Sequence, residues 1–91
     1  MRFQPGQLVM TAGVYARIQQ DAEFERQVLA AYRRYLDGDW GEVDEEDAKE
    51  NERSLKHGFR LLGAYTINDT KIWIITEADR SQTTILFPEE Y

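Results

Sequence analysis

The fold is decided by residues 59–87, which read FRLLGAYTINDTKIWIITEADRSQTTILF. From Phe59 to Ile67 the odd-numbered positions are mostly large and apolar, the period-two pattern of a half-buried β-strand. Asn68-Asp69 is typical of a two-residue hairpin turn, and Thr70 to Glu77 then forms the returning strand. This part of the chain therefore predicts a β-hairpin.

The second half of the same stretch extends the hairpin by one strand. The run Ile72-Trp73-Ile74-Ile75 is apolar at consecutive positions, which indicates a central strand covered on both sides. The chain is predicted to turn at residues 78–81, and Gln82 to Phe87 form a last strand that Pro88 ends, because proline cannot donate to a sheet. Residues 59–87 are thus predicted to form a three-stranded antiparallel β-meander.

The residues before the meander predict one short strand and three helices. Gln7 to Met10 is a short apolar run, and Thr11 is a candidate N-cap for a helix over 12–20. Further helices are predicted over 22–36, capped by Asp21, and from Asp44 to Gly58. The prediction is a single α+β domain over residues 1–91, in the order β-α-α-α-β-β-β, with the helices packed on one face of the meander.

Length and composition exclude several classes of protein. With 91 residues there is room for one hydrophobic core, and no apolar run approaches the ~20 residues that a membrane helix needs. The absence of cysteine excludes disulfides and thiol nucleophiles, and the single histidine argues against histidine-rich metal sites. We therefore expect a cytoplasmic protein that has no cofactor and does not bind a membrane.

The acidic residues are concentrated in the middle of the chain. Nine of them lie between Asp37 and Glu52, where Lys49 is the only base, so this segment carries a charge of −8. The other residues hold eight acids and ten bases and carry +2. The net charge of −6 therefore originates in the acidic turn and helix start over residues 37–52.

This segment is the first candidate binding site. Carboxylates spaced along a helix like phosphates can occupy the basic surface of a protein that handles nucleic acid, without the chain itself binding nucleic acid. The alternative interpretation is that these acids only cap a surface helix and keep it in solution. A calcium loop is not predicted, since the spacing lacks the twelve-residue pattern. The candidate partner-binding residues are Asp37, Asp39, Glu42, Asp44, Glu45, Glu46, Asp47 and Glu50.

A secondary candidate surface lies at the turn between the last two strands, where acidic, basic and hydroxyl side chains occur together. It comprises Glu77, Asp79, Arg80 and Thr83. In an enzyme, Glu77 or Asp79 would serve as a base, Arg80 as an anion clamp, and His57 as a further acid–base group. The alternative is that Asp79 is a turn residue, Arg80 pairs with a neighbouring acid and the threonines are ordinary strand formers.

Residues 37–91 also resemble a known group of sequences. The resemblance rests on Gly38-Asp39-Trp40-Gly41, on Asp44-Glu45-Glu46-Asp47, on residues 70–81 and on Pro88-Glu89-Glu90-Tyr91. They resemble a family of small proteins labelled plasmid-related or hypothetical, which are encoded on bacterial plasmids, phages and integrated elements. The resemblance implies a mobile-element setting and no particular reaction.

Three functional hypotheses follow. The leading one is a non-enzymatic interaction protein that binds a basic surface of a host nucleic-acid-handling or defence protein, as a DNA mimic directed against restriction or CRISPR systems would. The second is a small toxin or nuclease, because the order of elements is similar in outline to RelE-like ribonuclease toxins, although a basic cleft is missing from the sequence. The third is a homodimer or larger homo-oligomer formed through an exposed edge of the meander.

Overall fold

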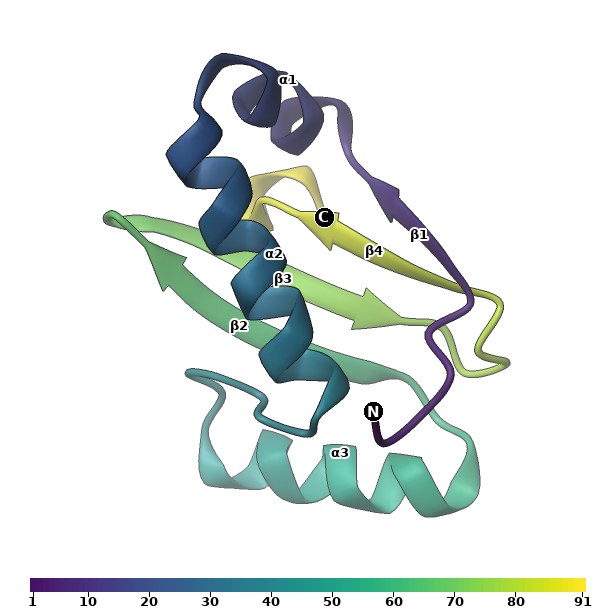
Figure 1. The fold of residues 1–91 in the computed structure, drawn as a ribbon. Coiled ribbons are helices and arrows are strands. Elements are labelled where there is room, and N and C mark those ends of the chain that lie inside the picture. The colour runs from purple at the N-terminus through teal and green to yellow at the C-terminus, as the bar shows by residue number, and fades with distance from the viewer.

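A computed structural model describes residues 1–91 and confirms the α+β class (Figure 1). The elements follow in the order β1 (Gln7–Met10), α1 (Ala12–Gln20), α2 (Ala22–Leu36), α3 (Glu45–His57), β2 (Leu61–Ile67), β3 (Thr70–Thr76), β4 (Gln82–Leu86) and a 3₁₀ helix, η1 (Pro88–Glu90). None of the helices is both long enough and apolar enough to cross a membrane.

The sheet contains the predicted meander and one additional pairing. Its strand order is β1-β4-β3-β2, so β3 has a neighbour on each side, as its apolar sequence predicts. Asn68 and Asp69 both have positive φ, 48° and 65°, the backbone of a tight hairpin turn between β2 and β3. The first strand, β1, lies parallel to β4, with Gln7 opposite Gln82 and Met10 opposite Ile85. The meander is therefore part of a four-stranded mixed sheet.

The helices begin where their capping residues predict. The side chains of Thr11, Asp21 and Asp44 each accept a hydrogen bond from the backbone N–H three residues later. At its other end α3 stops at Gly58, whose φ of 74° gives a left-handed cap. Local sequence signals therefore account for these helix ends.

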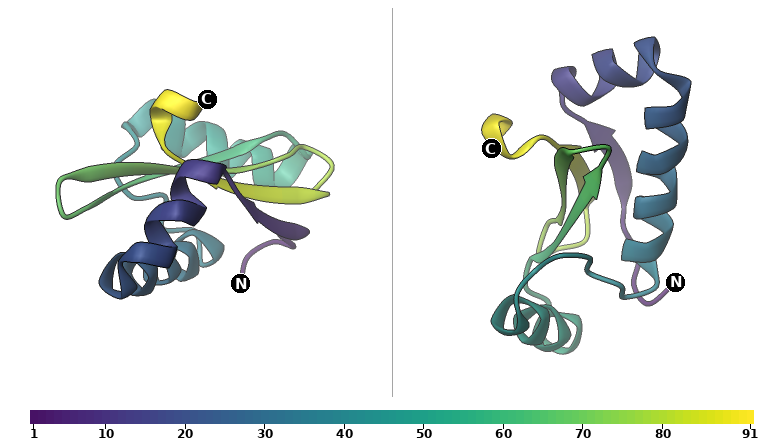
Figure 2. Two further views of the ribbon diagram at one scale, coloured as in Figure 1. Left: turned by 90° about the horizontal axis from the view of Figure 1, so that it is seen from above. Right: turned by 90° about the vertical axis from the view of Figure 1, so that its left-hand side faces the viewer.

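The helices do not all share one face of the sheet. Figure 2 shows α1 and α2 together on one face, whereas α3 lies at the β2 edge, which corrects the predicted arrangement. The side chains of α3 that are buried, Asn51 and Ser54, are polar. Asn51 accepts from the N–H of Leu62 and donates to its carbonyl oxygen, so it binds the edge of β2 as a neighbouring strand would. A helix with so little apolar surface cannot replace α2 over the core.

The hydrophobic core lies between α1, α2 and the sheet. Its largest fully buried side chains include Phe24 and Tyr35 from α2 and Tyr65 and Ile74 from the sheet. On the opposite face of the sheet η1 folds back, and Tyr91 makes an edge contact with the ring of Trp73. That face has no α1 or α2 above it, and it carries a pocket.

Candidate functional site

The acidic turn, by which we mean the residues of the acidic segment that precede α3, is attached to the β2 edge of the sheet through backbone hydrogen bonds. Trp40 is buried, and its carbonyl oxygen accepts from the N–H of Ala64 at 3.1 Å. Glu42 donates its own N–H to the carbonyl oxygen of Ala64 at 2.7 Å. Gly41, which lies between them, forms an isolated parallel bridge with Ala64. These contacts hold the acidic turn in one conformation beside β2.

All eight candidate partner-binding carboxylates are exposed, and five of them already have a partner within the chain. The paired ones are Asp37 with the amino group of Met1 (3.1 Å), Asp39 with Arg34 (2.7 Å), Glu42 with Thr66 (2.9 Å), Asp44 with the N–H of Asp47 (2.8 Å) and Glu50 with Arg53. The hydrogen bond from Arg34 holds the pKa of Asp39 below its usual value. Much of the acidity therefore has a local structural role.

The other three form what we call the free acidic turn: Glu45, Glu46 and Asp47, whose carboxylates have no ion pair and no side-chain hydrogen bond. They occupy the first turn of α3, where negative charge interacts favourably with the helix dipole. Lys49 lies four residues after Glu45 but forms no salt bridge with it. The free acidic turn is thus the part of the acidic segment whose charges remain available.

Glu52, at the end of the acidic segment, joins three parts of the chain. It accepts two hydrogen bonds from the Arg2 guanidinium, at 2.8 and 2.9 Å, and one from the indole N–H of Trp40 at 3.1 Å. The hydrogen bonds from Arg2 and then Trp40 hold the pKa of Glu52 below its usual value. Glu52 therefore ties the N-terminal segment and the acidic turn to α3.

Glu52→Gln is expected to weaken the pH dependence of stability on the acid side. A carboxyl whose pKa is lowered in the folded state adds stability above its unfolded pKa and loses it as pH falls through its folded pKa. The contribution at neutral pH is at most about 1 kcal/mol, because the pair is half exposed. Urea unfolding of wild type and Glu52→Gln from about pH 6 to about pH 3 measures it, with Glu45→Gln as the control. If the free energy of unfolding fell equally steeply with decreasing pH in Glu52→Gln and in wild type, Glu52 would not contribute to the pH dependence.

At the secondary candidate surface, Arg80 is occupied by the backbone. Its guanidinium donates to the carbonyl oxygens of Phe59, Glu77, Ala78 and Ser54 at 2.7, 3.1, 3.2 and 3.0 Å. It thereby connects the β3–β4 turn to the end of α3 and to the residues before β2. Its partners are carbonyl groups and not the carboxylates that the sequence suggested. Arg80 therefore has a structural role, since its hydrogen bonds hold the β3–β4 turn against the end of α3.

Thr83 does not lie on the surface, contrary to its assignment to the secondary surface. It is fully buried, and its hydroxyl donates to the carbonyl oxygen of Pro5 at 2.8 Å. The same hydroxyl is 2.7 Å from that of Thr76, which is 2.7 Å from the hydroxyl of Tyr35. Thr83 faces the helices because alternation along β4 places it on the core side with Ile85. These side chains form a buried hydroxyl chain.

The remaining members of the predicted catalytic group lie apart from one another. Asp79 is exposed and accepts from the N–H of Ser81 at 2.9 Å, the turn role that its position predicts. His57 is exposed in the last turn of α3, with its ring 6.2 Å from that of Phe59. No hydrogen bond or ion pair joins the side chains of His57, Glu77, Asp79 and Arg80, and no three acidic or histidine side chains form a cluster that could hold a metal ion.

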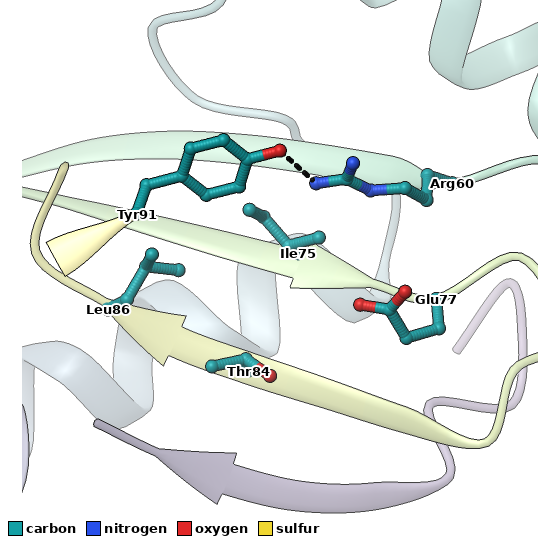
Figure 3. A pocket seen from close by; sticks show the side chains of 6 residues that line it. All are labelled: Arg60, Ile75, Glu77, Thr84, Leu86 and Tyr91. Atoms are coloured by element: carbon teal, nitrogen blue, oxygen red, sulfur yellow. Dashed lines mark hydrogen bonds between the residues drawn. The ribbon is translucent and has the colours of Figure 1, made fainter.

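Glu77 belongs to a different feature, a pocket on the face of the sheet opposite α1 and α2. The pocket has a volume of about 130 Å³ and is lined by Arg60, Ile75, Glu77, Thr84, Leu86 and Tyr91 (Figure 3). Sequence reasoning found only Glu77 among these residues. Period two along β3 and β4 places Ile75, Glu77, Thr84 and Leu86 on one face, but the approach of Arg60 and Tyr91 depends on tertiary packing.

The fold and these two surfaces define a small α+β domain with an acidic turn at one sheet edge and a pocket on one sheet face. No family model, curated protein or solved structure matches the chain. The resemblance of residues 37–91 to the plasmid-related family therefore stays a prediction.

Proposed function

We propose that this chain is a non-enzymatic interaction protein of a mobile genetic element that binds a basic surface of a host nucleic-acid-handling or defence protein through the free acidic turn. The observation that carries the proposal is that Glu45, Glu46 and Asp47 are exposed together and unpaired. The mobile-element setting rests on the resemblance of residues 37–91.

Unpaired carboxylates are the ones that favour binding. A partner that approached Asp39 or Glu50 would compete with Arg34 or Arg53, whereas the free acidic turn offers its oxygens without breaking an internal pair. Three consecutive residues on one helical turn spread their carboxylates over an arc of about 200°. They can therefore meet several lysine or arginine side chains of a basic groove.

The free acidic turn is also held rigidly. Asp44 caps α3 through the N–H of Asp47, and Trp40 with Gly41 fixes the preceding residues to β2. A preorganised surface loses less conformational entropy on binding than a flexible acidic tail would. Glu42 and Asp44, which are exposed and paired only with uncharged groups, add a negative field around it that steers a basic partner.

Binding is expected to depend on the three charges and on salt. In an affinity capture from bacterial lysate, the wild-type protein should retain a nucleic-acid-binding protein at low salt, lose it at high salt and release it to duplex DNA. The variant Glu45→Gln, Glu46→Gln, Asp47→Asn should bind that partner about tenfold more weakly or worse. The matched control Glu25→Gln, Asp69→Asn, Glu89→Gln removes the same charge from other exposed positions and should bind like wild type.

Two results would refute this function. A captured partner that is held equally at both salt concentrations would show that charge does not drive binding. Equal loss of binding in the triple variant and in its matched control would show that only net charge matters and that the position of the free acidic turn does not.

A further inference from the structure

We propose that the pocket on the open sheet face binds a small zwitterion with a short aliphatic group, namely a free α-amino acid of the size of valine. The inference is independent of the proposed partner, because no carboxylate of residues 37–50 lines the pocket. It rests on the two opposite charges beside the pocket, its apolar floor and its volume.

The charges come from a cross-strand position that does not form a pair. Leu61 is opposite Thr76 at the end of the antiparallel register of β2 and β3, and extending this register by one residue beyond the strands would place Arg60 opposite Glu77, on the face away from the helices. Opposite charges at such positions normally attract each other. Here no salt bridge joins them, and Figure 3 shows their side chains at the same end of the pocket.

Arg60 is instead directed toward the C-terminal residue. Its guanidinium donates to the hydroxyl of Tyr91 at 3.0 Å and lies 5.6 Å from the centre of that ring. Glu77 as a residue is half-buried, and its carboxylate is accessible and has no hydrogen-bond partner within the chain. The pocket is therefore flanked by a cation that has further N–H donors available and by an unpaired anion.

The floor between them is apolar. Ile75 and Leu86 are 5% and 4% exposed, and Thr84, opposite Ile75 in the register of β3 and β4, places a hydroxyl beside them. The ring of Tyr91 closes one side (Figure 3). A short aliphatic group can lie on this floor, and burying it is favourable.

Charge and size together select the ligand class. An amino acid can donate from its ammonium group to Glu77 and accept at its carboxylate from Arg60, whereas a ligand with one charge can form only one of these two charge-assisted hydrogen bonds. The pocket volume of about 130 Å³ is slightly below the ~150 Å³ of a cavity that admits benzene, so the pocket can hold a short aliphatic side chain while the ammonium and carboxylate groups of the ligand lie at its open rim. L-Valine meets both conditions.

The test is an NMR titration of the whole chain with three probes: L-valine, L-valinamide, which lacks the carboxylate, and 3-methylbutanoate, which lacks the ammonium group. L-Valine should shift the amide signals of Ile75, Thr84 and Leu86 saturably, with a dissociation constant on the order of 1 mM. Each single-charge probe should bind about tenfold more weakly, because it loses one charge-assisted hydrogen bond.

Two variants assign the charges. Glu77→Gln should abolish the preference for L-valine over 3-methylbutanoate, and Arg60→Gln should abolish the preference over L-valinamide. Arg60 is exposed and Glu77 is half-buried, and the dispersion of the amide spectrum checks that both variants fold. Lys71→Gln and Glu25→Gln remove the same charges elsewhere and should bind like wild type. The proposal is overturned if L-valine gives no saturable shift at the pocket, if the three probes bind equally, or if both pocket variants keep the wild-type preferences.

Discussion

Thr76→Val is expected to lower the free energy of unfolding by about 2–4 kcal/mol, because it interrupts the buried hydroxyl chain at its centre. The carbonyl oxygen of Pro5 can only accept, so Thr83 must donate to it. Thr83 then accepts from Thr76, and Thr76 accepts from Tyr35. Each hydroxyl has one proton to donate. The donor and the acceptor of every hydrogen bond in the buried hydroxyl chain are therefore determined.

Valine at position 76 leaves two buried groups without partners. The hydroxyl of Tyr35 loses its acceptor, and the hydroxyl of Thr83 loses its donor, while water cannot replace either because both side chains are fully buried. Burial also raises the pKa of Tyr35, so this phenol stays protonated and depends on its acceptor. Val and Thr have similar shapes, and the loss therefore measures hydrogen bonding more than packing.

Urea unfolding of Thr76→Val checks this expectation, with Thr84→Val as the control. Thr84 is half-buried on the other face of β4 and its hydroxyl has no hydrogen bond within the chain, so its replacement should change stability by less than about 0.5 kcal/mol. Tyr35→Phe, which removes only the first donor, should cost about 1–2 kcal/mol. Similar losses for Thr76→Val and Thr84→Val would show that the hydroxyl chain does not stabilise the fold.

Gly41→Ala is expected to cost at least about 3 kcal/mol, and to loosen the acidic turn from β2. Gly41 has a φ of 76°, and a Cβ there would overlap the carbonyl oxygen of Ala64 and lie 2.7 Å from the Tyr65 ring. The chain cannot move away without breaking the hydrogen bonds that Trp40 and Glu42 form with Ala64. The strain of the left-handed backbone adds to the overlap.

Gly58→Ala separates the cost of the steric overlap from the cost of the left-handed backbone. Gly58 has almost the same φ, 74°, but a Cβ at this position meets nothing within 4 Å. Its replacement should therefore cost only the backbone strain, about 1 kcal/mol. Faster hydrogen exchange at the Ala64 amide in Gly41→Ala would report the lost contact with Trp40. Equal losses for the two glycine variants would mean that the overlap at Ala64 is relieved without breaking the bridge.

Gly41→Ala also tests the proposed function, because it changes how the acidic turn is attached to β2 and removes none of its charges. If Gly41→Ala folds but releases the turn, Glu45, Glu46 and Asp47 keep their charges and α3 stays attached to β2 through Asn51, but the residues that precede α3 no longer support its first turn. Partner capture by this variant should then weaken while its salt dependence remains. Unchanged capture would indicate that the free acidic turn binds without preorganisation.

The sequence by itself determined the secondary structure of this protein. Thr11, Asp21 and Asp44 cap the predicted helices, and Asn68-Asp69 forms the predicted hairpin turn. Each of these signals acts through backbone groups a few residues away, so a short window of sequence contains the whole interaction. The burial of β3 was also predictable, because a strand that is apolar on both faces needs cover on both sides.

Only the tertiary structure decided which of these elements meet. The parallel pairing of β1 with β4, the position of α3 at the β2 edge and the burial of Thr83 against Pro5 join residues that are far apart in the chain. The same holds for the distinction between paired and free carboxylates, and for the pocket that Arg60 and Tyr91 complete. Periodicity shows that a side chain faces one side of its own element, but the partner on that side depends on how all the elements pack together.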